Sequence, residues 1–321
     1  MTLAIETRRL TKHYGAERGI VDVDLDVRQG EVFGLLGPNG AGKTTTIRIL
    51  LDFIRPTSGE ARVLGMDARK QSVAVRRRVG YLPGELATYE TLSGRELFAY
   101  LGNLRGGVEE ASVRQLADRL EFDMDRRIAA LSKGNKQKAG LVQAFMGKPE
   151  LVVLDEPTTG LDPLIQEQVH GLIREAAQDG RTVFLSSHIL REAEQLCTWA
   201  GIIRQGRLVT VESVEALKAK AFKRLEIEFG EPVPPPAFAG LPGVRDVTVK
   251  DSRLSCTVTG PLDAVIKAAA RFQVLNVTSE QPSLEEVFLA YYSGNNAQSA
   301  TAEARPAPAA DGGPQEAIGR A

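Results

Sequence analysis

The sequence predicts an α/β protein with a mixed, mostly parallel sheet at its core, followed by a smaller α+β domain. Strand-like and helix-like segments alternate over residues 1–220, a glycine-rich segment separates an apolar strand from a helix, and the composition changes after residue 220. Strands that alternate with helices favour a sheet covered by helices on both faces. We therefore expect a large domain over residues 1–220, a small domain over residues 221–293 and a disordered tail over residues 294–321.

The elements of the large domain follow from its hydrophobic pattern. Residues 3–10 and 21–27 alternate apolar with polar side chains, as half-buried strands do. Short apolar runs are typical of buried parallel strands, and they occur at residues 32–36, 151–154 and 182–185. Helical periodicity covers residues 45–53, 94–104, 109–120, 135–145, 163–177 and 190–196. No strand is predicted from about residue 85 to residue 146, so we expect a helical insert there.

The small domain is predicted from shorter segments. A proline-rich stretch resembles a linker and contains Pro232, Pro234, Pro235 and Pro236. Strands are expected over residues 244–249, 253–259 and 274–279, and helices over residues 262–271 and 283–291. After residue 293 the chain has almost no large apolar side chain, so burial cannot offset the entropy lost on ordering.

Composition narrows the classes of partner. The formal net charge of −1 gives no reason to expect a nucleic acid. Cys197 and Cys256 are far apart in the sequence and form no metal-binding pattern, so we interpret both as reduced thiols. No window approaches the ~18 apolar residues that a membrane-spanning helix needs. Any role at a membrane is therefore expected to depend on a partner.

A phosphate-binding loop is predicted directly after the strand at residues 32–36. The segment fits the pattern G-x-x-x-x-G-K-[ST] and leads into a helix. Glycines let successive backbone N–H groups converge on phosphate oxygens at the helix N-terminus. Lys43 is expected to reach the outer phosphates, and the Thr44 hydroxyl to ligate Mg²⁺. The residues assigned to the nucleotide are Gly37, Pro38, Asn39, Gly40, Ala41, Gly42, Lys43, Thr44 and Thr45.

Two carboxylates end the apolar strand at residues 151–154. They are Asp155 and Glu156. Side chains at the carboxyl ends of parallel strands face the crevice in which ligands bind. Asp155 is expected to hold Mg²⁺, and Glu156 to polarise the water that attacks the γ-phosphate. A solvated acidic turn is the alternative for an isolated motif of this kind.

The order of these motifs resembles the ATP-binding subunits of ABC transporters over residues 1–220. Leu131-Ser132-Lys133-Gly134-Asn135 stands where that family has its LSGGQ signature, and Lys133 and Asn135 depart from the usual residues. The resemblance implies that Ser132 and Gly134 face the γ-phosphate held by another subunit. A plain helix N-cap is the alternative role for Ser132.

The same resemblance implies three further roles. Tyr14 matches the aromatic residue that stacks on adenine, and His188 matches the histidine that contacts the γ-phosphate. Gly160-Leu161-Asp162 resembles the loop that couples the two sites of a dimer. A half-buried tyrosine at a strand end and a polar surface histidine are the alternatives.

One segment departs from the family pattern. Where the family has a glutamine after Gly-Tyr-x-Pro, this chain has Gly84, and Glu85 follows it. Two interpretations of Glu85 stay open. It ligates Mg²⁺ in place of the glutamine, or it serves only the helical insert.

The segment at residues 282–289 resembles the C-terminal end of ATPases that serve ABC-2 type exporters of the drug-resistance kind, although an amphipathic helix would give a similar pattern. The resemblance implies a dimer, with a second copy or a paralogous subunit, that hydrolyses ATP at the cytoplasmic face of the plasma membrane. It would power export, for example of drugs or antibiotics, through separate ABC-2 type permease subunits. An importer ATPase is one alternative, and an ABC ATPase acting on ribosomes or DNA is another. A P-loop kinase or GTPase would leave residues 131–135 and His188 unexplained.

Overall fold

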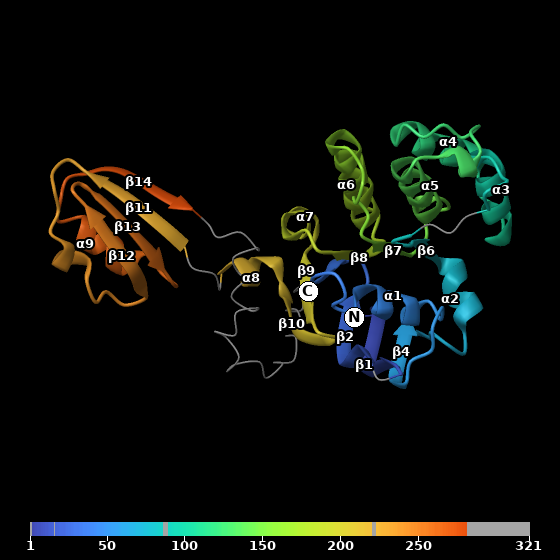
Figure 1. Cartoon of the computed structure of the whole chain (residues 1–321), viewed down its shortest axis with the longest axis horizontal. Helices are drawn as coiled ribbons and strands as arrows, with labels where there is room; N and C mark the ends of the chain where they lie inside the picture. The colour runs from blue at the N-terminus through green and yellow to red at the C-terminus, as the bar shows by residue number, and fades with distance from the viewer. Residues whose placement is uncertain (1, 16, 86–88, 220–222, 281–321) are drawn as a thin grey trace, which may run out of the picture.

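The computed structural model describes residues 2–15, 17–85, 89–219 and 223–280 (Figure 1). The described residues form three sheets, with strand orders β10-β9-β3-β8-β7-β6, β2-β1-β4-β5 and β12-β13-β11-β14. The helix expected over residues 283–291, the segment at residues 282–289 and the tail over residues 294–321 lie outside the described residues.

The six-stranded sheet is parallel except at one edge, where β10 runs antiparallel to β9. The strands predicted at its centre are confirmed, and each of them is fully buried. Continuous apolar runs suit such strands because both faces of the sheet are covered. The strands are β3 (Val32–Leu36), β6 (Val79–Leu82), β7 (Leu151–Asp155), β8 (Thr182–Ser187), β9 (Trp199–Arg204) and β10 (Arg207–Ser213).

The first two predicted strands are confirmed as strands but belong to a separate antiparallel sheet. β1 (Leu3–Tyr14) pairs with β2 (Glu17–Arg28) on one side and with β4 (Ser58–Val63) on the other. The short β5 (Met66–Asp67) completes this sheet. An antiparallel sheet tolerates water on one face, which agrees with the alternating pattern of the first two strands.

Eight α-helices are described in residues 2–219. They are α1 (Lys43–Leu50), α2 (Ser72–Arg78), α3 (Gly94–Leu104), α4 (Glu110–Arg119), α5 (Lys133–Phe145), α6 (Pro163–Gln178), α7 (Leu190–Leu196) and α8 (Val214–Ala219). The helices predicted over residues 94–104 and 190–196 are confirmed, and the others predicted in this region begin or end within a few residues of α1, α4, α5 and α6. In Figure 1, α3, α4 and α5 lie together to one side of the parallel sheet. None of the described helices is both long and apolar enough to cross a membrane.

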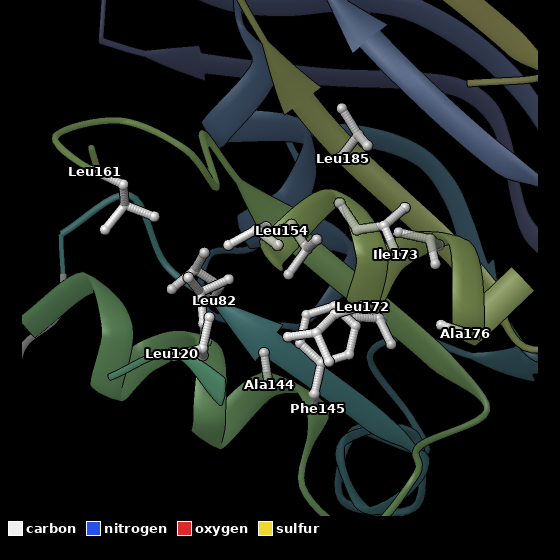
Figure 2. Close-up of a cluster of buried hydrophobic side chains, with 14 of the residues drawn as sticks. Leu82, Leu120, Ala144, Phe145, Leu154, Leu161, Leu172, Ile173, Ala176 and Leu185 are labelled. Atoms are coloured by element: carbon white, nitrogen blue, oxygen red, sulfur yellow. The ribbon is translucent and has the colours of Figure 1, made fainter. Parts of the chain in front are cut away.

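Two hydrophobic cores lie on opposite faces of the parallel sheet, because side chains alternate along each strand. Phe33 and Phe184 stack in the core shared with α1 and the antiparallel sheet, with ring centroids 5.7 Å apart. Leu154 and Leu185 point into the other core, which α5 and α6 cover (Figure 2). The carboxyl ends of β3, β7 and β8 are thereby fixed relative to one another.

The C-terminal sheet has its own core and contradicts the linker prediction. β11 (Lys223–Phe229) precedes the proline-rich stretch and pairs with both β13 (Arg253–Val258) and β14 (Val274–Glu280). Val233, between Pro232 and Pro234, and Phe238, just after the prolines, are buried in the core of this sheet. The stretch is therefore part of the small domain, between β11 and β12 (Val244–Lys250). Proline content alone did not show that a strand comes before it. The helix α9 (Asp263–Ala269) buries Val265 in the same core.

A single glycine makes the contact between the parallel sheet and the helical insert possible. A Cβ atom added at Gly80 on β6 would lie 1.8 Å from the backbone oxygen of Ala144 on α5. Because backbone atoms on both sides must shift, we expect Gly80→Ala to destabilise the protein by about 3 kcal/mol. A chemical denaturation curve measures this loss.

The matched control is Gly171→Ala on α6. There the new methyl group meets the guanidinium end of Arg119 and, at 3.9 Å, the Glu175 carboxylate, both of them ends of flexible side chains that can move, and alanine favours the helix. We expect this variant to unfold at the same denaturant concentration as the wild type, or at a slightly higher one. Equal stability of Gly80→Ala and the wild type would contradict the packing described here.

Candidate active site

The phosphate-binding loop lies between β3 and α1, as predicted. Gly42 has a φ of 111°, and a Cβ there would lie 2.6 Å from the Ile20 side chain on β2. At Gly37 a Cβ would lie 2.5 Å from the backbone oxygen of Ile203 on β9. Glycine is required at both positions because the loop is pressed against two strands. The N–H group of Gly37 also donates to the Ser187 carbonyl oxygen at 3.3 Å, which ties the loop to the end of β8.

A row of three charged or titratable side chains crosses the site. The Lys43 ammonium donates to the carbonyl oxygens of Gly37 at 2.6 Å and Pro38 at 3.2 Å. It also lies 3.1 Å from Glu156 Oε1, and Glu156 Oε2 lies 2.5 Å from His188 Nδ1. Lys43 is 5% exposed, whereas the His188 side chain is 42% exposed. The row therefore runs from the floor of the loop to the open surface.

Glu156 is held in place by its backbone. It has a φ of 54°, which is uncommon for a residue other than glycine. Its N–H group lies 3.2 Å from the Ser186 carbonyl oxygen and 3.1 Å from Ser186 Oγ. The Gln137 amide on α5 donates to the carbonyl oxygens of Glu156 and Pro157 at 3.1 and 3.2 Å. These bonds offset the cost of the backbone conformation and turn the carboxylate towards Lys43.

Asp155 has one satisfied oxygen and one that lacks a partner. Ser186 Oγ donates to Asp155 Oδ1 at 2.5 Å, and the residue is completely buried. Among the described residues, nothing hydrogen-bonds to Asp155 Oδ2. A buried carboxylate oxygen without a partner is costly, which makes it a good candidate ligand for a cation or a bound water.

Gly84 lies beside this free oxygen. A Cβ at Gly84 would be 3.3 Å from Asp155 Oδ2, so the absence of a side chain leaves room there. Glu85 is exposed, and within the described part of the chain it has no ion pair or hydrogen bond. Tyr81, on β6 just before this turn, has its pKa raised to about 12, first by burial and then by the charge of Asp155. The phenol therefore stays neutral at physiological pH.

A cavity of about 260 Å³ lies over the loop. It brings together predicted residues from β1, the loop, α1 and the end of β7, and Tyr14 at its edge is 45% exposed. The residues that line it are Tyr14, Gly19, Pro38, Asn39, Gly40, Ala41, Gly42, Lys43, Thr44, Thr45 and Glu156. Gly19 was not predicted; a Cβ there would lie 2.8 Å from the Tyr14 ring, so the glycine lets this ring lie flat against β2.

Ser132 and Gly134 are not among the residues that line this cavity. Ser132 is the N-cap of α5, and its Oγ accepts a hydrogen bond from the Asn135 N–H at 3.3 Å. The residue is nevertheless exposed, so the helix end faces outward. A Cβ at Gly134 would lie 3.1 Å from the carbonyl oxygen of Gly160, so the first turn of α5 lies beside Gly160.

Two further residues that support the site were not predicted, Ser186, which donates to Asp155, and Gln137, which donates to the Glu156 carbonyl oxygen. Ser186 is opposite Asp155 in the parallel register of β7 and β8, and no local pattern reveals such a register. Gln137 shares a buried helix face with Leu141 and Ala144. A polar residue on that apolar face is the signal that would have revealed it.

Comparison with known proteins agrees with this geometry. The family model described as "ABC transporter" matches residues 20–159. The chain is 36% identical to the bacitracin transport ATP-binding protein BcrA of Bacillus licheniformis, over 72% of this chain and 76% of that protein. It is 34% identical to the daunorubicin resistance ATP-binding protein DrrA3 of Streptomyces coeruleorubidus, over 89% of this chain and 95% of that protein. The chain belongs to the ABC transporter family.

A solved structure extends the likeness to three dimensions. It is described as the ATP-binding subunit of an ABC transporter, has a TM-score of 0.62 and 33% sequence identity, and covers 68% of this chain and 92% of its own. As an ABC transporter ATP-binding subunit, the chain binds ATP and hydrolyses it. The predicted fold class and enzyme class are thereby confirmed.

Proposed function

We propose that this chain powers export of a drug-like molecule, and that Lys43, Glu156 and His188 act on the γ-phosphate of ATP. The row formed by these side chains, which runs from Lys43 and Glu156 in the lining of the cavity to the exposed His188, is the observation that carries the site assignment. The direction of transport rests on the bacitracin and daunorubicin resistance proteins to which the chain is similar.

Binding of ATP uses groups already in place. The cavity is lined by the loop and by the first turn of α1, where a helix N-terminus favours phosphate, and Tyr14 at its edge offers an aromatic face to adenine. Lys43 now bonds to two carbonyl oxygens and to Glu156. Phosphate oxygens carry more charge than carbonyl oxygens, so the ammonium is expected to turn towards the β- and γ-phosphates when ATP enters.

Glu156 is the proposed general base. When Lys43 turns to the phosphates, the carboxylate keeps the bond to His188 and gains a free oxygen that faces the attacking water. His188, on the open side, is positioned to donate a hydrogen bond to the γ-phosphate and to hold the water in line. The reaction transfers the γ-phosphoryl group to water, and Glu156 accepts the proton that the water loses.

The free oxygen of Asp155 fits a Mg²⁺ ion bound together with ATP. Thr44, which lines the cavity, would supply a hydroxyl ligand, and Mg²⁺ would neutralise charge on the phosphate oxygens. Among the described residues, no cluster of acidic, histidine and cysteine side chains is complete enough to hold a metal alone, so the phosphates must contribute ligands. Glu85, next to the room left by Gly84, is the proposed further ligand, through a water molecule.

The active site is proposed to be completed by a second copy of the chain. Ser132 and Gly134 lie outside the cavity of their own subunit, and the α5 N-terminus faces outward. An exposed helix N-terminus capped by a serine hydroxyl is suited to an anion, and the γ-phosphate held by a partner is that anion. The loop at residues 160–162, which touches Gly134, would connect the two sites. A paralogous ATPase subunit is the alternative partner.

The exporter proposal requires a membrane partner, because no described helix spans a membrane. An ABC-2 type permease at the cytoplasmic face of the plasma membrane is the proposed partner. We expect the chain to remain on washed membranes only when the permease is present, and inside-out vesicles carrying both to accumulate bacitracin or daunorubicin when ATP is added. Vesicles that contain Glu156→Gln protein are the control and should not accumulate either drug.

Other outcomes would reject this proposal. Uptake from the other side of the membrane would identify an importer. Recovery of the chain with ribosomes or DNA, and not with membranes, would support a non-transport ATPase. In both cases the site assignment would stand while the exporter proposal fails.

A further inference from the structure

Next to His188 in the chain begins a buried series of three polar side chains, none of which lines the cavity over the phosphate-binding loop. It runs from Ser187 at the end of β8, through Glu192 on α7, to His170 on α6. Glu192 is 5% exposed and His170 is 7% exposed. Burying a carboxylate this deeply costs desolvation free energy. If one of its partners is removed, the hydrogen bonds that offset this cost are lost.

Ser187 is the point where this chain meets the active site. Its Oγ donates to Glu192 Oε2 at 2.8 Å and accepts from the Ile189 N–H at 2.9 Å. Its carbonyl oxygen accepts the N–H of Gly37, the first residue of the phosphate-binding loop. The backbone on both sides of His188 is therefore anchored through one hydroxyl group, and Glu192 orients that hydroxyl.

The second oxygen of Glu192 is poorly satisfied. Oε1 has no hydrogen-bond partner among the described residues, and the nearest cationic candidate is His170 Nε2 at 3.8 Å. His170 Nδ1 in turn lies 3.5 Å from Glu167 Oε2. The Glu192 charge also raises the pKa of the buried Cys197 thiol further, after burial itself. A more stable core would have an apolar residue at position 192, so stability does not account for this carboxylate.

We propose that Glu192 is a positioning residue for ATP hydrolysis, which holds His188 against the γ-phosphate by fixing the Ser187 hydroxyl. This inference rests on the proposed role of His188. The His188 side chain is 42% exposed, and among the described residues its ring has one hydrogen-bonding partner, Glu156. Its position therefore depends on the backbone turn at residues 187–189 more than on packing around the ring. When the Ser187 hydroxyl loses its carboxylate acceptor, only the longer bond to the Ile189 carbonyl oxygen, at 3.3 Å, remains for it, so the turn gains freedom and the ring is misplaced during the chemical step.

The test compares Glu192→Ala, Ser187→Ala and the double variant in steady-state ATP hydrolysis. We expect each single variant to lower kcat by about tenfold or more, while the Kd for ATP changes by less than about threefold, because the ATP-binding groups lie elsewhere. The double variant should be no slower than the slower single variant, because both remove the same hydrogen bond. Glu192→Gln should restore most of kcat, because its amide oxygen accepts the same bond.

Glu194→Ala is the matched control. Glu194 lies on the same short helix, and it pairs with Lys218 at 3.8 Å, away from the active site. This variant should hydrolyse ATP at the wild-type rate. The value of kcat is reported per folded molecule, and melting temperatures are measured in parallel. A residue with a purely structural role would lower only the folded fraction of the protein, whereas a positioning residue lowers the kcat of the folded molecules.

The outcomes separate this inference from the proposed function. Wild-type kcat in both Glu192→Ala and Ser187→Ala would overturn the positioning role and leave the ATPase assignment intact. The positioning role would also be overturned if the fold-decreases in kcat of the two single variants multiply in the double variant, because the two residues would then act independently. A purified wild-type protein that releases no phosphate from ATP would overturn the proposed function, and the inference with it.

Discussion

Replacing Lys43 with alanine is expected to abolish ATP hydrolysis. The ammonium is buried, and Lys43 is the one positively charged residue among the described residues that line the cavity. Loss of one preorganised donor of this kind typically lowers kcat by about 10²–10³-fold, and loss of its charge also weakens ATP binding. Phosphate release by the purified variant measures the effect.

Lys70→Ala is the control for this substitution. Lys70 pairs with Asp67 on the surface, and its side chain is 83% exposed. The control should keep the wild-type rate and stability. Wild-type turnover by Lys43→Ala protein, free of contaminating ATPase, would show that residues 37–45 do not form the site.

Glu156→Gln is expected to stop hydrolysis while ATP still binds. Glutamine keeps the shape of the side chain but cannot accept the proton that the attacking water must lose, so we expect kcat to fall by about 10²–10⁴-fold. The Kd for ATP should stay within a few-fold of the wild-type value, because Lys43 and the loop are intact. A filter-binding assay with labelled ATP, run alongside phosphate release, distinguishes the two effects.

Glu175→Gln is the matched control on α6. Glu175 Oε2 pairs with Arg119 on the surface at 2.7 Å, and this ion pair lowers the pKa of the carboxyl group. Loss of an exposed pair should leave hydrolysis unchanged. If Glu156→Gln protein turns over ATP like this control, another residue must be the general base.

The local motifs could be predicted from the sequence because their chemistry is local. The phosphate-binding loop needs only its own glycines, Lys43 and the flanking strand and helix, and all of these are consecutive in the chain. The buried strands were predicted well because a short, continuous apolar run is typical of a parallel strand that is covered on both faces. The roles of Tyr14 and His188 were predicted from the family resemblance instead, because no local pattern assigns these two residues to the same site.

Contacts between distant segments could not be predicted. β9 and β10 escaped prediction, and β9 pairs with β3, which is far away along the chain. The same limit hid the pairing of Ser186 with Asp155, because it depends on how β8 is placed beside β7. The proline-rich stretch misled for a related reason, since its neighbours Val233 and Phe238 are buried by strands later in the sequence.

We propose that one ATP site needs two subunits, with Lys43 from one and Ser132 from the other. The most direct test is the mass of Glu156→Gln protein, measured by size exclusion with light scattering in the presence of ATP and Mg²⁺. We expect twice the monomer mass with ATP and the monomer mass without it, because ATP that is not hydrolysed holds the two copies together. Adding Ser132→Arg should keep the protein monomeric while ATP still binds, since the new cation fills the space at the partner's γ-phosphate. A Glu156→Gln protein that binds ATP and stays monomeric, or a double variant that dimerises equally well, would contradict the claim.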